Sequence, residues 1–148
     1  MTAMATDDPF DLERFVTAQE VGGTYQQALA ELRAGRKTSH WMWFVFPQIA
    51  GLGRSPTALF YAIASAAEAR AYLAHPLLGP RLRECTHAVL AQRGRSAEAI
   101  FGGVDAIKLK SSMTLFEAVA GDPAQFASVL EAFFDAERDP ATLMLLDG

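Results

Sequence analysis

The segment from Trp41 to Pro47 constrains the fold more than any other part of the sequence. Six large apolar residues follow one another without a break, from Trp41 to Phe46. A surface helix needs only three or four apolar residues in every seven, so a segment that is apolar on all sides must be enclosed on all sides. Both tryptophans of the chain lie here, and each needs a partner for its indole N–H if it is enclosed. The sequence therefore predicts a compact core around this segment.

Two interpretations of the segment remain open. In the first, it is a central helix or strand of the core, and the flanking His40 and Gln48 bond to nearby backbone groups. In the second, Trp41, Trp43 or Phe44 lines a cleft, where a flat aromatic ring could stack on a planar ligand and the polar neighbours could orient it.

Basic, glycine and hydroxyl residues lie on both sides of the apolar segment. Arg36 and Lys37 precede it, and the stretch Gly51-Leu52-Gly53-Arg54-Ser55-Pro56 follows it. Glycines let the backbone approach a ligand, and the Ser-Pro start of a helix leaves free N–H groups that attract anions. The stretch matches neither the Walker pattern nor the dinucleotide fingerprint. A glycine-rich connector with a surface arginine is therefore the simpler interpretation.

A second unusual stretch runs from Lys108 to Thr114, where hydroxyl residues interrupt a helix whose apolar face is otherwise intact. Ser111 and Ser112 lie three and four residues after Lys108, so an ammonium and a hydroxyl can share one helix face. A lysine-activated serine is a known nucleophile, but serines in helices more often bond the carbonyl one turn back. We assign no catalytic residue. We expect this stretch to meet the apolar segment at a pocket with these candidate ligand-binding residues: Lys37, His40, Trp41, Trp43, Gln48, Arg54, Ser55, Lys108, Ser111 and Ser112.

Apolar residues recur at helical spacing along most of the chain, and its 148 residues are the usual length of one domain. No sustained period-2 alternation and no hairpin turn signal occur, so a sheet is not expected. Ser65 followed by Glu68 is a capping-box pair. Helices are predicted over about residues 9–20, 24–34, 65–74, 78–93, 96–101, 105–120 and between 123 and 139. We therefore predict an all-α fold, a lead-in over residues 1–8 and one compact domain over 9–148, with about seven to nine short helices in an irregular, superhelix-like stack.

Composition excludes several classes of function. The net charge of −4 argues against general binding to nucleic acid or to an anionic membrane. Cys85 is the only cysteine, so an internal disulfide and a cysteine-based zinc site are excluded. No metal-binding spacing occurs and no cofactor is expected. The absence of a signal-like N-terminus or a long apolar run predicts a cytoplasmic protein.

Four runs of the sequence are distinctive: DLERFVTAQ, HWMWFVFPQIAGLG, HPLLGPRLRECT and IFGGVDAIKLKSSMTLF. In these runs the chain closely resembles a bacterial family of unknown function whose members are often labelled calpastatin, and mycobacterial members look most similar. The resemblance covers about Asp8 to Phe134. It implies an all-helical fold with a right-handed arrangement of helices, and no established activity or catalytic residue. We reject the calpastatin label, because calpastatins are long, polar and disordered whereas this chain is half apolar.

Two hypotheses of function follow from these patterns. In the first, the chain binds a small, planar, anionic and nucleotide-like ligand in a pocket lined by tryptophan, histidine, arginine and lysine. In the second, it is a protein-interaction module without catalytic activity, and the apolar segment is simply core. A large exposed apolar patch would favour the second hypothesis. The identity of a protein partner is not indicated by the sequence.

Overall fold

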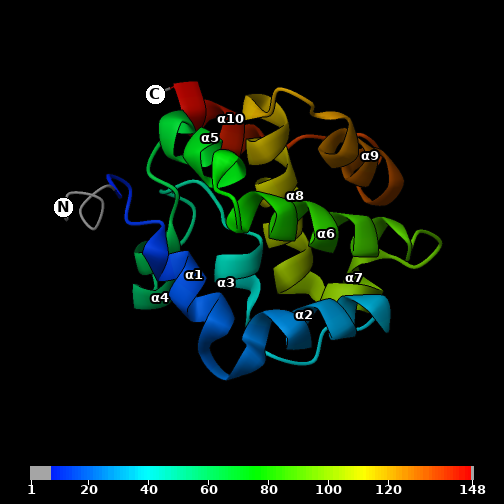
Figure 1. Ribbon diagram of the computed structural model, residues 1–148. Helices are drawn as coiled ribbons and strands as arrows, with labels where there is room; N and C mark the ends of the chain where they lie inside the picture. The colour runs from blue at the N-terminus through cyan, green and yellow to red at the C-terminus, as the bar shows by residue number, and fades with distance from the viewer. Residues whose placement is uncertain (1–7, 148) are drawn as a thin grey trace.

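A computed structural model describes residues 8–147 of the chain, and Figure 1 shows that they fold into helices and connecting loops. Residues 1–7 of the predicted lead-in lie outside the described part. The α-helices are α1 (Glu13–Glu20), α2 (Thr24–Arg33), α3 (Met42–Val45), α4 (Pro56–Tyr61), α5 (Ala66–Ala74), α6 (Leu78–Leu90), α7 (Ala97–Phe101), α8 (Gly103–Val119), α9 (Ala124–Phe133) and α10 (Pro140–Asp147). Residues 8–147 contain no strand, only isolated bridges such as the parallel one between Ile49 and Ile63. The prediction of an irregular all-α domain is confirmed.

Helix α8 runs through the middle of the molecule, with α5, α9 and α10 around one end and α7 beside the other (Figure 1). Six consecutive residues of α8, from Ser111 to Phe116, are buried. Because helices pack against α8 from several sides, its polar residues cannot all reach water. Thr114 instead donates a hydrogen bond to the carbonyl of Lys110, one turn back, and the Ser111 hydroxyl lies 3.2 Å from the carbonyl of Ile107 in the same arrangement. This is the ordinary role of a hydroxyl residue inside a helix.

The apolar segment that dominates the sequence forms the short helix α3 and the turn after it. Five of its side chains are buried: Trp41, Met42, Val45, Phe46 and Pro47. Only Trp43 and Phe44 are partly exposed. Each interpretation of the segment therefore holds in part, because most of it is core whereas Trp43 reaches the surface.

The predicted helix starts agree with the capping side chains. The Ser65 hydroxyl accepts a hydrogen bond from the Glu68 backbone N–H, as the capping pair predicts. The first helix begins at Glu13, later than the predicted Pro9, because the Asp8 carboxylate accepts bonds from the backbone N–H groups of Leu12 and Glu13 across an intervening turn. The apolar residues that follow form α10, which packs on α8.

A buried carboxylate holds the chain between α2 and α3. Glu31 of α2 is 5% exposed and accepts five hydrogen bonds. Its donors are the backbone N–H groups of Thr38 (2.8 Å) and Ser39 (3.0 Å), the Ser39 hydroxyl (2.5 Å), the Gln27 amide (2.8 Å) and the Trp41 indole N–H (2.9 Å). A buried charge is stable only when it is well hydrogen-bonded. Glu31 meets this condition and at the same time provides the partner that an enclosed Trp41 requires.

We expect Glu31→Ala to lower the free energy of unfolding by about 3 kcal/mol, because it leaves several buried donors without an acceptor. Glu20→Ala is the matched control, since Glu20 pairs with Arg81 but its side chain is 57% exposed. That change should cost no more than about 1 kcal/mol. Urea denaturation followed by tryptophan fluorescence measures both values. Equal losses of unfolding free energy in the two variants would show that the hydrogen bonds to Glu31 stabilise the fold no more than an exposed ion pair does.

Stability should also depend on pH through Glu31. Burial alone raises the pKa of Glu31, but hydrogen bonds from Ser39, Gln27, Thr38 and Trp41 outweigh it and lower the pKa from 4.5 to about 2. A pKa that is lower in the folded state stabilises the fold above pH 4.5, and this contribution is lost as the pH falls towards 2. The shift corresponds to about 3 kcal/mol.

Glu31→Gln removes this titration, so the stability difference between the wild type and Glu31→Gln should shrink as the pH falls from 6 to 3. Urea denaturation at several pH values measures the difference. A difference that stays constant over this range would mean that the Glu31 pKa is not lowered by folding.

Candidate functional site

A cleft of about 470 Å³ lies between one face of α8 and the segment that runs from α3 to α4. Its lining residues are Trp43, Gln48, Leu52, Gly53, Arg54, Ser55, Ala58, Val104, Ile107, Lys108, Ser111 and Asp139. The structure thus brings together six of the ten residues predicted for a ligand site: Trp43, Gln48, Arg54, Ser55, Lys108 and Ser111. A volume of this size is typical of small-molecule sites.

One wall of the cleft is a stripe along α8. Val104, Ile107, Lys108 and Ser111 follow the spacing i, i+3, i+4 and i+7, which places them on the same helix face. Val104 and Ile107 are 71% and 68% exposed, so this wall is apolar near the start of the helix. It becomes polar at Lys108 and Ser111.

The opposite wall is the glycine-rich connector and the start of α4. The Ser55 hydroxyl accepts a hydrogen bond from the Ala58 backbone N–H and so caps α4. A Cβ atom at Gly53 would lie 2.7 Å from the Cβ atom of Ala58, which is too close for any other residue without a shift of the backbone. The glycine therefore allows the connector to fold back onto α4. The connector starts from the bridge between Ile49 and Ile63, whose backbone groups fix its position.

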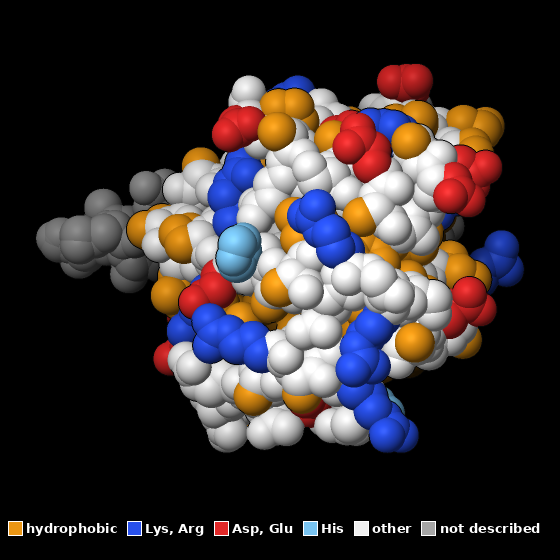
Figure 2. Space-filling model, turned by 90° about the vertical axis from the view of Figure 1, so that its right-hand side faces the viewer, with side chains coloured by type: hydrophobic (Ala, Val, Ile, Leu, Met, Phe, Trp, Pro, Cys, Tyr) orange, Lys and Arg blue, Asp and Glu red, His pale blue; other side chains and the backbone are white. Residues whose placement is uncertain are grey.

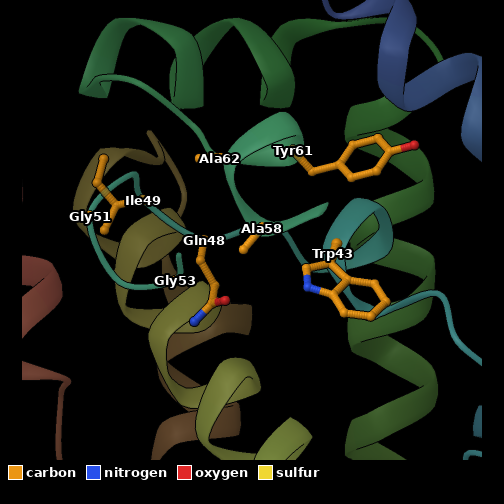
Figure 3. Close-up of a pocket in the computed structure, with 8 residues that line it drawn as sticks. All are labelled: Trp43, Gln48, Ile49, Gly51, Gly53, Ala58, Tyr61 and Ala62. Atoms are coloured by element: carbon orange, nitrogen blue, oxygen red, sulfur yellow. The ribbon is translucent and has the colours of Figure 1, made fainter. Parts of the chain in front are cut away.

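At its inner end the cleft leads to a recess of about 10 Å³, which is close to the space that one water molecule needs. Figure 3 shows the eight residues that line this recess. The Gln48 side chain extends from the connector, and the indole nitrogen of Trp43 is on the edge of the ring that faces Gln48 (Figure 3). Neither the Gln48 amide nor the Trp43 N–H forms a hydrogen bond with residues 8–147, whereas the Trp41 N–H does. Both groups are therefore available to a ligand.

Trp43 and Lys108 form the junction between the two walls. The Lys108 ammonium lies over the Trp43 ring, 4.4 Å from its centroid, a geometry in which the ring attracts the cation. The same ammonium is 3.5 Å from the Asp105 carboxylate, which also forms an ion pair with Lys37 at 2.8 Å. Asp105 thus fixes two lysines, and no local pattern in the sequence indicates this pairing. Lys108 is held in place at the cleft by its aromatic and acidic neighbours.

Ser111 and Asp139 form the far side of the cleft. The Ser111 hydroxyl is 2.9 Å from one carboxylate oxygen of Asp139, which also accepts bonds from the Thr142 hydroxyl (2.5 Å) and the Thr142 backbone N–H (3.3 Å). Asp139 is therefore the capping residue of α10. Nothing local in the sequence indicates this role, because it depends on the packing of α10 against α8.

Arg54 differs from most basic residues of the chain. It is exposed, and its guanidinium forms no ion pair or side-chain hydrogen bond with residues 8–147. The other cation of the cleft, Lys108, has Asp105 as its partner. Arg54 is therefore the cleft's available positive charge.

Four residues of the predicted site lie away from the cleft. Trp41 is fully buried and bonded to Glu31, so it is a core residue and cannot contact a ligand. The Lys37 side chain is 7% exposed and is satisfied by Asp105 and the Ser39 carbonyl. His40 is exposed but does not line the cleft. Ser112 is fully buried on another face of α8 from that of Ser111, and its hydroxyl has no hydrogen-bond partner among residues 8–147.

Other kinds of site have little support in the described part of the chain. Burial raises the pKa of the Cys85 thiol to about 12, which makes it a poor nucleophile. Residues 8–147 hold no group of three or more histidine, cysteine or acidic residues that could bind a metal. No helix in this range has the length and apolar character that a bilayer span requires.

The charge of the surface bears on nucleic-acid binding. On the face drawn in Figure 2, lysine and arginine side chains are interspersed with acidic and apolar ones, and no broad surface of one charge covers it. The expectation that the chain does not bind nucleic acid in general stays a prediction.

Comparisons with known proteins place the chain in a family. The comparison with curated proteins found no match. A crystal structure at 1.38 Å of a conserved hypothetical protein from Mycobacterium tuberculosis is similar, with 52% sequence identity and a TM-score of 0.92 over 95% of this chain and 99% of that one. A family model described as "Protein of unknown function (DUF1810)" matches residues 9–146. The chain therefore belongs to this family, which agrees with the resemblance in its tryptophan-rich run.

Proposed function

We propose that this protein binds a small anionic molecule in the cleft between α8 and the α3–α4 segment. The observation that carries the proposal is the available guanidinium of Arg54 in a cleft that also holds Lys108. An unpaired arginine beside a concave surface favours carboxylate or phosphate, because its planar fork of donors matches these groups. The donors of Gln48 and Trp43 add directional contacts at the inner end.

The geometry supports an anionic ligand more strongly than it supports a planar ligand that stacks on the Trp43 ring. The Lys108 ammonium already occupies one face of the Trp43 ring, so a ligand on that face would displace the lysine. Trp43 instead positions Lys108 and offers its N–H group. The volume of about 470 Å³ fits a small organic molecule better than a single inorganic ion.

A protein-interaction role is the second candidate, and the exposed apolar side chains favour it. Val104 and Ile107 stand between the cleft and a neighbouring hollow of about 570 Å³ that also includes Phe133 and Phe134. Together they form an apolar ridge on the surface, and such ridges are often contact sites. In that case association should depend on protein concentration and on Ile107, and Arg54 should have no effect on it.

The first test compares two exposed arginines. We expect Arg54→Gln to weaken the binding of pyrophosphate by at least about tenfold, because a charge-assisted contact to phosphate is lost. Arg70→Gln is the matched control, since Arg70 on α5 is exposed, has no ion pair with residues 8–147 and does not line the cleft. Isothermal titration calorimetry measures both affinities. Equal weakening by the two changes would mean that binding depends only on overall charge and would contradict the proposal.

The second test uses the different environments of the two tryptophans. Trp43 is partly exposed at the cleft whereas Trp41 is fully buried, so pyrophosphate should change the emission of Trp43 only. The Trp43→Phe variant, in which Trp41 is the only tryptophan, should show no change on titration. A ligand-dependent signal that survives in Trp43→Phe would place binding elsewhere.

A further inference from the structure

Asp139 brings an unpaired negative charge to the same cleft as Arg54. One of its carboxylate oxygens accepts the bonds from Ser111 and Thr142, and the other oxygen, Oδ1, has no hydrogen bond within residues 8–147. No ion pair of Asp139 occurs in this range either. The carboxylate is partly exposed and lines the cleft, so a ligand can reach it.

Two opposite charges that face one cleft without pairing with each other restrict what can bind there. A ligand that carries only anionic groups would pair with Arg54 but leave the Asp139 carboxylate without a partner. A complementary ligand carries both an anionic group and hydrogen-bond donors. It also needs an apolar face, because Val104 and Ile107 otherwise expose apolar surface to water.

The cleft thus offers a cation, a free carboxylate oxygen and an apolar wall. From these three features, and resting on the proposed function, we infer that the cleft binds a nucleoside monophosphate. The phosphate binds Arg54, the two ribose hydroxyls donate to the free oxygen of Asp139, and the base covers Val104 and Ile107. A carboxylate is the acceptor that nucleotide sites commonly use for ribose hydroxyls.

The role of Asp139 is tested with AMP and its 2′,3′-dideoxy analogue, which differ only in the two hydroxyls. The wild-type protein should bind AMP at least about tenfold more tightly, since hydrogen bonds to a charged acceptor are lost in the analogue. Asp139→Asn should abolish this preference. The capping of α10 should survive the change, because asparagine caps helices as well as aspartate. Calorimetry gives the affinities and circular dichroism checks the fold.

Two variants serve as controls. Asp122→Asn makes the same chemical change at an exposed position before α9, where Asp122 accepts a bond from the backbone N–H of Ala124; it should keep the preference for AMP. Arg54→Gln should weaken AMP and the dideoxy analogue alike and leave their ratio unchanged, because Arg54 contacts only the phosphate.

The outcomes separate this inference from the proposed function. Equal affinity of the wild-type protein for AMP and the dideoxy analogue, both dependent on Arg54, would overturn the ribose assignment and leave anion binding intact. A preference for AMP that persists in Asp139→Asn would overturn it as well. If pyrophosphate, AMP and the analogue all fail to bind at millimolar concentration, the proposed function and the inference both fail.

Discussion

The Glu31 carboxylate is the interaction on which the rest of the structure depends. The residues after α2 have no helical periodicity, so nothing in their own sequence fixes their path to α3. The five hydrogen bonds to Glu31 supply that constraint, and they come from the backbone as well as from side chains. The constraint is strong because a buried charge that loses its donors is costly.

The position of Trp41 determines where the cleft forms. Since Trp41 is held inside by Glu31, the one-turn helix α3 directs Trp43 to the other side, towards α8. There Lys108 packs over the Trp43 ring and Asp105 holds Lys108. Asp105 also pairs with Lys37, which precedes the residues bonded to Glu31. The loop before α3 is thus held by the Glu31 carboxylate of α2 and by the Asp105 carboxylate of α8. Together these two carboxylates determine where Trp43 and its wall of the cleft lie.

The cleft combines features that a purely structural surface does not need. Most charged groups near it have partners, as Lys37, Asp105 and Lys108 do. Arg54 and the Oδ1 atom of Asp139 lack partners within residues 8–147 although they face the same cleft. Without protein partners these groups are solvated by water and contribute no ion pair to the stability of the fold. Their presence together is more consistent with recognition than with packing.

The helices could be predicted from the sequence because the signals that define them are local. Apolar spacing and capping residues act within one or two turns, so the bounds of α2, α5 and α9 follow from neighbouring residues. The start of α1 was placed too early because the Asp8 cap acts across a turn. The hydroxyl of Thr114 bonds the carbonyl one turn back, as the sequence pattern favours, whereas Ser112 has no partner within residues 8–147 and Ser111 also contacts Asp139.

The sequence by itself determined an all-α domain and indicated that most of the apolar segment is enclosed, and it offered Arg54, Trp43 and Lys108 as candidates for one site. Only the tertiary structure decided which tryptophan is core and which reaches the cleft, and it added Asp139. The physical reason is distance along the chain. Ser111 and Asp139 are 28 residues apart, and their contact exists only because α10 packs on α8. Glu31 was missed because a charged residue near an apolar stripe is usually solvated, and its donors become visible only when the loop folds back over it.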